Sequence, residues 1–262
     1  MSDILIKKYY LDCVDADGRA FIGYSAELEW RSINLHFQSY LLSNGASHIE
    51  TRSSLKRDAF PAVKNDSIEW NSSPLMLQGT WLARTRGVRQ ELFSSPQCSI
   101  IWNGLQPLSD CFIQLKQNET ITGKGYAECL ELRLAEWRLP LSELKWGRFL
   151  SEDLALVWID WEGEEERHLV FWNDTVLQRC TIADDHLLMP ERNARLALTR
   201  HRVLKESSVV PPALANIPGL SCMLPRSLMQ SHEAKWLSAG TLTQPDAPDR
   251  YGWAIHERVV FR

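Results

Sequence analysis

Three acidic residues stand out because the strand pattern around each places it on the apolar side: Glu128, Asp160 and Glu257. Side chains on a strand point alternately to opposite faces. In residues 124–135 this alternation puts Glu128 on one face with Tyr126 and three leucines. A carboxylate that faces apolar groups must be paired or protonated. Each of the three is therefore either half of a buried ion pair or a general acid whose pKa is raised by desolvation.

The other two acids follow the same alternation. In the last strand-like segment Glu257 shares a face with Trp253, and near the middle of the chain Asp160 shares a face with Trp158 and two leucines. If these acids form buried ion pairs, nearby arginines could supply the cation. The candidates are Arg138, Arg148 and Arg258.

The chain carries none of the common signatures of catalytic or cofactor sites. H-E-x-x-H, G-x-S-x-G, the P-loop and G-x-G-x-x-G are all absent. None of the six cysteines forms a C-x-x-C pair or lies near a histidine at zinc-ligand spacing. We therefore expect reduced thiols, no metal and no cofactor. The histidines lie in polar contexts or opposite apolar faces, and none is predicted to be functional.

Tryptophan is unusually frequent, with 11 residues in the chain. Indole rings fill wide interiors and line apolar cavities. We expect them either to fill the protein core or to line a pocket for a hydrophobic molecule. The predicted pocket residues are Trp137, Trp146, Arg148, Trp158, Asp160, Trp253 and Glu257.

Short strand-like segments separated by turn residues dominate the chain. They are expected at 9–14, 20–30, 33–42, 47–56, 67–71, 75–83, 98–104, 110–116, 124–135, 154–161, 168–173, 176–182, 194–204, 233–243 and 251–261. Such spacing predicts a barrel or sandwich rather than an α/β fold. The only helix expected is a short one within 213–230, which its prolines limit. The predicted fold class is all-β, with antiparallel β-barrels and little helix.

The domain organisation is predicted from a polar turn and a weak repeat. The turn at residues 116–120 gives two halves of similar size, with domains at 1–118 and 119–262. A glycine followed by an aromatic residue and a nearby glutamate recurs at Gly23, Gly125 and Gly252. A tandem duplication would produce this recurrence, and so would chance similarity between strands.

Composition excludes several classes of protein. The net charge of −4 and the pI near 6.0 give no electrostatic basis for binding nucleic acid. No apolar run approaches the roughly 18–20 residues needed to cross a bilayer, and the start of the chain does not resemble a signal peptide. We therefore expect a cytoplasmic protein without a membrane span. The sequence does not indicate an oligomeric state.

One stretch in the middle of the chain resembles a known group of proteins. The residues that carry the likeness are Gly123, Gly125, Tyr126, Glu128, Trp137, Leu139, Pro140, Leu144, Trp146, Gly147 and Arg148. The stretch is similar to the lipocalin-related superfamily of carotenoid hydratases (hydroxyneurosporene synthases), AttH-like proteins and, more distantly, tocopherol cyclase. It is closest to an uncharacterised bacterial branch of that superfamily. The match covers about 30 residues of the chain.

The resemblance implies two consecutive lipocalin-like β-barrels and hydration or cyclisation of isoprenoid double bonds. Glu128 then stands where the family has its acid, with Tyr126, Trp146 and Arg148 beside it. The family's histidine before the acid is Ala127 here, so a histidine–carboxylate relay is lacking at this position.

Three functions are consistent with these features. The first is binding of a hydrophobic small molecule, isoprenoid or lipid-like, in an aromatic-lined pocket. The second is a lyase or isomerase of hydratase or cyclase type, which protonates a double bond with Glu128 as general acid and Tyr126 beside it. The third is a structural scaffold whose barrels are filled by side chains.

Overall fold

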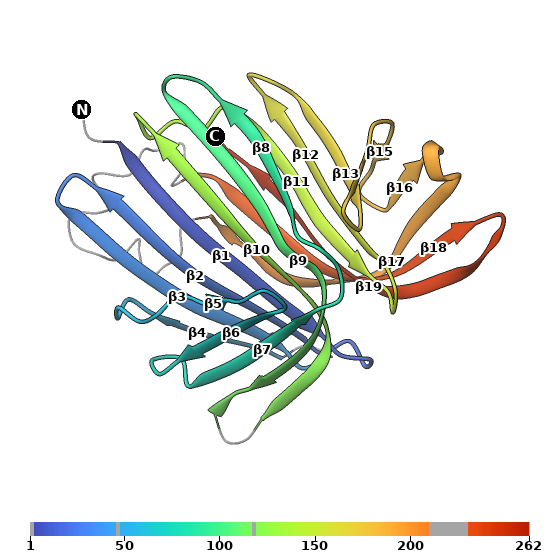
Figure 1. Cartoon of the computed structure of the whole chain (residues 1–262), viewed down its shortest axis with the longest axis horizontal. Coiled ribbons are helices and arrows are strands. Elements are labelled where there is room, and N and C mark those ends of the chain that lie inside the picture. The colour runs from blue at the N-terminus through green and yellow to red at the C-terminus, as the bar shows by residue number, and fades with distance from the viewer. Residues whose placement is uncertain (1–2, 46–47, 117–118, 210–229, 262) are drawn as a thin grey trace. The chain divides into compact units, whose positions relative to one another are not determined.

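The computed structural model describes residues 3–45, 48–116, 119–209 and 230–261, and these residues build two compact units, Met1–Leu139 and Pro140–Arg262 (Figure 1). Strands make up nearly all the regular structure in these ranges. They are accompanied by the 3-10 turn η2, Pro190–Arg192, and by no α-helix. The predicted all-β class is confirmed. The helix expected within 213–230 falls almost wholly outside the described residues.

The first unit is one antiparallel sheet that curls into a half-barrel (Figure 1). Its strand order is β4-β3-β2-β1-β10-β9-β7-β6-β5, and β8 also pairs with β9. The strands are β1 Ile4–Val14, β2 Ala20–Trp30, β3 Ile33–Ser43, β4 Ile49–Ser54, β5 Ala62–Val63, β6 Ser67–Ser72, β7 Leu77–Ala83, β8 Val88–Ser94, β9 Cys98–Gln114 and β10 Thr120–Leu134. The two strands predicted at 98–104 and 110–116 are thus one long strand, β9.

The second unit is a nine-stranded antiparallel sheet with the order β14-β13-β12-β11-β19-β18-β17-β16-β15. Its strands are β11 Leu141–Leu150, β12 Ala155–Gly163, β13 Arg167–Trp172, β14 Thr175–Leu177, β15 Thr181–Ile182, β16 His186–Met189, β17 Ala194–Ser208, β18 His232–Gln244 and β19 Ala247–Val260. Among the described residues, no helix has the length and hydropathy that a bilayer crossing requires.

Both units follow the same path through their sheets. In each unit the first strand pairs with the second on one side and with the last on the other, so β1 lies between β2 and β10 and β11 lies between β12 and β19. The division between the units falls after residues 124–135, whereas the predicted division near residue 118 falls before them. The physical reason is that β10 completes the first sheet by pairing with β1 and β9.

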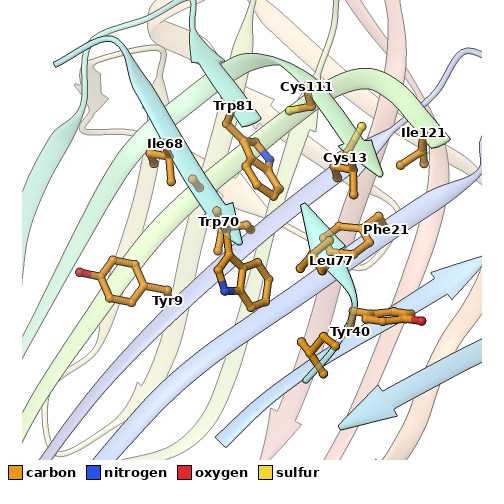
Figure 2. Packing of buried hydrophobic residues seen from close by; sticks show 14 of the residues in the cluster. Tyr9, Cys13, Phe21, Tyr40, Ile68, Trp70, Leu77, Trp81, Cys111 and Ile121 are labelled. Atoms are coloured by element: carbon orange, nitrogen blue, oxygen red, sulfur yellow. The ribbon is translucent and has the colours of Figure 1, made fainter. Parts of the chain in front are cut away.

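The concave interior of the first unit is filled by its own side chains. Figure 2 shows Trp70 and Trp81, from β6 and β7, lying among other aromatic side chains, such as Phe21 and Tyr40, and the thiol of Cys111. The indole N–H of Trp81 donates to the backbone oxygen of Asp12 at 2.8 Å. The Trp70 ring fits here because Gly23 has no side chain. A Cβ at Gly23 would collide with this ring.

A separate hydrophobic cluster fills much of the second unit. It includes Phe149, Trp158 and Leu196, from strands β11, β12 and β17. Glycines again make room for the rings. A Cβ at Gly147 would strike the Trp158 indole, and one at Gly240 would lie 2.5 Å from the Phe149 ring.

Candidate functional site

The Glu128 carboxylate is held by two hydrogen-bond donors on the first sheet. Its Oε2 accepts from the Tyr126 hydroxyl and from the Trp102 indole Nε1, each at 2.5 Å. Trp102 reaches Glu128 because Gly104, which pairs with Glu128 across β9 and β10, has no side chain. The Trp102 ring lies over Gly104, where a Cβ would be 2.9 Å from it.

Aromatic rings continue this cluster across the sheet. Tyr10 pairs with Glu128 on the β1 side and with Tyr24 on the β2 side. The ring of Tyr10 lies 5.4 Å from Tyr24, edge to face, and 6.0 Å from Tyr126. Tyr126 is completely buried, and burial together with the adjacent Glu128 carboxylate raises its pKa well above the ordinary value. We call Tyr10, Tyr24, Trp102, Tyr126 and Glu128 the Glu128 cluster.

The predicted alternation along β10 is present, but the hydrophobic cluster of the unit lies on the other face. Ala127 and Cys129 belong to that hydrophobic cluster, so Tyr126 and Glu128 project from the opposite face of the sheet. Both faces are buried at this point: Tyr126 and Ala127 are each 0% exposed. Alternation therefore identified the residues that share a face without identifying the face that the apolar interior occupies.

Glu257, the second predicted acid, occupies the matching position of the second unit. In the first unit Tyr10 pairs with Glu128 four residues before the β1–β10 pairing ends at Val14 and Lys124. In the second unit Trp146 pairs with Glu257 four residues before the β11–β19 pairing ends at Leu150 and Trp253. Glu257 forms an ion pair with Lys235, whose ammonium also lies 3.5 Å from Glu233. The cation is therefore a lysine on β18 and not one of the three arginines expected from the sequence. Glu257 is the member of a buried ion pair, as one of the two interpretations predicted.

The third predicted acid, Asp160, also has a partner. Its Oδ1 lies 2.5 Å from Nδ1 of His168 on the neighbouring strand β13. Asp160 lies two residues from Trp158, which belongs to the hydrophobic cluster, so it occupies the interior face as alternation predicted.

The remaining predicted pocket residues have different surroundings. Trp137 packs edge to face on Trp30 in the first unit, with ring centroids 5.6 Å apart. Arg148 is fully buried in the second unit and donates to the backbone oxygen of Trp253 at 2.8 Å. The Trp146 ring lies 5.8 Å from the Lys235 ammonium. Two shallow hollows, of about 600 and 440 Å³, lie near Met189 and Met76 in the described part of the chain, and none of these residues lines either hollow.

Several residues of interest were not predicted. Trp102 and Tyr10 lie in predicted strands, but their contact with Glu128 depends on strand pairing, which the local pattern does not contain. On the second unit, His201, Ser238 and His256 lie side by side. His256 was expected opposite the apolar side chains of its strand and was discounted, although that face points into the interior with Trp158.

Comparison with known proteins supports the fold. No protein-family model matches the chain, and no curated protein sequence matches it significantly. The crystal structure of CghA with Sch210972 is 9% identical, with a TM-score of 0.58 over 99% of this chain and 89% of that one. Kievitone hydratase from Nectria haematococca is 12% identical, with a TM-score of 0.52 over 98% of this chain and 88% of its own. The chain shares the two-barrel fold of these proteins, as the sequence resemblance predicted.

Proposed function

We propose that this protein binds a hydrophobic small molecule and exchanges a proton with it at the Glu128 carboxyl group, in a reaction of lyase or isomerase type. The observation that carries the proposal is the pair of hydrogen bonds from Tyr126 and Trp102 to one oxygen of Glu128. They fix the carboxyl group among aromatic rings, and a fixed carboxyl group beside a bound substrate is suited to general acid–base catalysis.

Each residue of the Glu128 cluster has a role in such a reaction. The carboxylic acid form of Glu128 gives its proton to one carbon of a substrate double bond, and the new C–H bond leaves a positive charge on the adjacent carbon. The electron-rich faces of Tyr10, Tyr24 and Trp102 stabilise that charge. Addition of water, followed by return of a proton to Glu128, completes a hydration. Loss of a neighbouring proton to Glu128 instead completes an isomerisation.

Tyr126 acts as a fixed donor and not as a base. Its raised pKa keeps the hydroxyl protonated at physiological pH, so it continues to donate to Glu128 while the carboxyl group gains and loses a proton. The substrate does not enter the concave interior of the first sheet, because Trp70, Trp81 and their neighbours fill it. It approaches the opposite face, where Glu128 and Tyr24 are the partly exposed members of the Glu128 cluster.

Two proteins that share the fold support this choice of chemistry. One is named a hydratase of kievitone, and the other was crystallised with the small molecule Sch210972. The alternative in which both barrels are inert scaffolds does not explain why two aromatic donors hold one carboxylate oxygen of Glu128 in a fixed position.

Deuterium incorporation tests the proposal with a range of candidate substrates. The purified full-length protein is incubated in D₂O with a panel of linear isoprenoids and prenylated phenols, and the products are analysed by mass spectrometry. We expect one class of compound to gain deuterium at carbon. Glu128→Gln should reduce the rate at least about a hundredfold, because a general acid typically contributes that much or more.

Glu131→Gln is the matched control, since Glu131 lies on the same strand with its side chain 46% exposed, 4.0 Å from Lys7. It should leave the rate unchanged. If a hydrophobic compound co-purifies equally with the wild type and with Glu128→Gln and no compound gains deuterium, the protein is a binding protein and catalysis at Glu128 is rejected.

A further inference from the structure

A chain of hydrogen bonds joins three strands of the second unit. His201 on β17 has its Nδ1 2.6 Å from the hydroxyl of Ser238 on β18. The same hydroxyl lies 2.8 Å from Nε2 of His256 on β19. Ser238 is completely buried and His256 is 8% exposed, whereas His201 is exposed. This series of hydrogen bonds therefore connects the buried imidazole of His256 with the solvent-exposed imidazole of His201.

Aromatic rings surround the buried imidazole. Trp236 is stacked on His256 at 5.4 Å between ring centroids, and Trp158 lies 6.4 Å away. Trp158 reaches His256 because its indole lies over Gly147, and Gly147 pairs with Trp158 on one side and with His256 on the other. Burial, with a smaller effect of His201, lowers the pKa of His256 to about 4, so His256 is neutral at pH 7.

Charged groups lie one row further along the same face of the sheet. They are Lys145 on β11, Asp160 on β12 and Arg258 on β19, and Asp160 and Arg258 are paired with His168 and Glu143. In the part of the chain that the structure describes, none of these groups bonds to His256. The Nδ1 atom of His256 likewise has no hydrogen-bond partner there. That atom is available to a ligand.

The chain of hydrogen bonds can run in either direction, because a hydroxyl group both donates and accepts. When a proton reaches Nδ1 of His256, the proton on Nε2 passes to the Ser238 oxygen. The hydroxyl proton of Ser238 then passes to Nδ1 of His201, which releases a proton to water. His256 ends neutral, in its other tautomer, and the reverse sequence returns a proton to the ligand.

We propose that the second unit contains its own proton-exchange site, in which Nδ1 of His256 hydrogen-bonds to a planar phenol or enol and Ser238 relays the proton to His201. The hydroxyl group of such a ligand donates to Nδ1 when that nitrogen carries no proton, and accepts from Nδ1 when it does. A planar ring matches the indole surface of Trp236, which is partly exposed. This site is independent of Glu128.

Histidine-selective nitrogen-15 NMR of the full-length protein tests the site, with 2-naphthol as the probe. We expect saturable shifts of both His256 and His201 on titration. His256→Phe should weaken 2-naphthol binding about tenfold, because a buried hydrogen bond is lost. His168→Asn is the matched control on the same unit and should bind normally. If 2-naphthol shifts neither imidazole, the proposal is wrong.

The relay is tested separately by the exchange of the His256 ring proton with water. Ser238→Ala should slow this exchange at least about tenfold and remove the response of His201 to 2-naphthol, while His256 still responds. Ser238→Thr keeps the hydroxyl and should restore both. If Ser238→Ala does not fold, His201→Gln interrupts the chain at its exposed end and should slow the exchange equally. Unchanged exchange in these variants would exclude the relay.

Discussion

Two glutamates in matching positions have different surroundings, and this difference is the main result at the scale of residues. Glu257 forms an ion pair with the buried Lys235. Glu128 accepts hydrogen bonds from Tyr126 and Trp102, which are neutral groups. The two glutamates therefore differ in the described donors that hold them: an ammonium for Glu257, and a phenol and an indole for Glu128.

The Trp102 indole N–H should contribute measurably to stability. Trp102→Phe keeps an aromatic ring but removes the donor to Glu128, and we expect a loss of about 1–2 kcal/mol, because the partly buried acceptor loses a hydrogen bond. Urea unfolding measures the change. Trp137→Phe is the control, because the Trp137 indole N–H has no partner in the described ranges. Equal losses in the two variants would mean that ring size, and not the hydrogen bond, is responsible.

His256 should make the protein less stable in acid. Its pKa falls from 6.5 in the unfolded chain to about 4 in the folded protein. The unfolded chain therefore binds a proton more readily, and stability that is fully present above pH 6.5 is lost as the pH falls to 4. The two values imply about 3 kcal/mol. Unfolding free energies measured from pH 7.5 to pH 4 should show this slope in the wild type and lack it in His256→Asn.

At this scale the sequence predicted part of the candidate site. It singled out Glu128, Tyr126, Asp160 and Glu257, because an acid among apolar residues is visible in a two-residue period. It did not identify Trp102 or Ser238. Their contacts cross from one strand to another, and the register of that pairing is not encoded in either strand alone.

At the scale of elements, glycines in the strands decide where the large rings lie. The Trp158 indole covers Gly147, and a Cβ at that position would also lie 2.8 Å from the Cβ of His256. Gly147→Ala should therefore destabilise the protein by about 3 kcal/mol, a cost typical of overpacking. Thermal unfolding of Gly147→Ala, Trp158→Ala and the double variant measures it. The two losses should be non-additive, because truncating Trp158 removes the closest collision and leaves only the contact with His256. Additive losses would place the strain elsewhere.

The strand β18 carries a buried cation between two acids. Lys235 is 2% exposed and lies beside Glu233 and Glu257. Lys235→Met should cost about 3–5 kcal/mol, since it leaves the largely buried Glu257 carboxylate without its cation. Lys205→Met, which removes a more exposed partner of Glu233, should cost less than about 1 kcal/mol. Chemical denaturation would contradict this view if both variants were equally stable.

Most strands could be predicted, and the errors have clear causes. The predicted strand 20–30 matches β2, and 233–243 lies within β18. The long strand β9 was divided because its middle residues, around Pro107, interrupt the alternation. The strand β11 was not predicted, because both of its faces are buried near its end and no polar alternation remains there.

At the scale of the whole molecule, each unit has its own hydrophobic cluster, and the two clusters share no residue. Truncating a large side chain in either cluster should cost about 3–5 kcal/mol. Trp70→Ala tests the first cluster and Phe149→Ala the second, with circular dichroism during urea unfolding as the measurement. A loss below about 1 kcal/mol in either variant would mean that the corresponding interior is not the tightly packed core that the structure describes.

Because both halves trace one strand order, each provides a built-in reference for the other. Gly104 is to Glu128 what Lys235 is to Glu257, since each pairs with its glutamate across the neighbouring strand. Gly104→Lys would thus place an ammonium beside Glu128, as in the other half, and its side chain would displace the Trp102 ring that lies over Gly104. One strand order therefore carries two arrangements of a glutamate, one beside an ammonium and one beside an indole and a phenol.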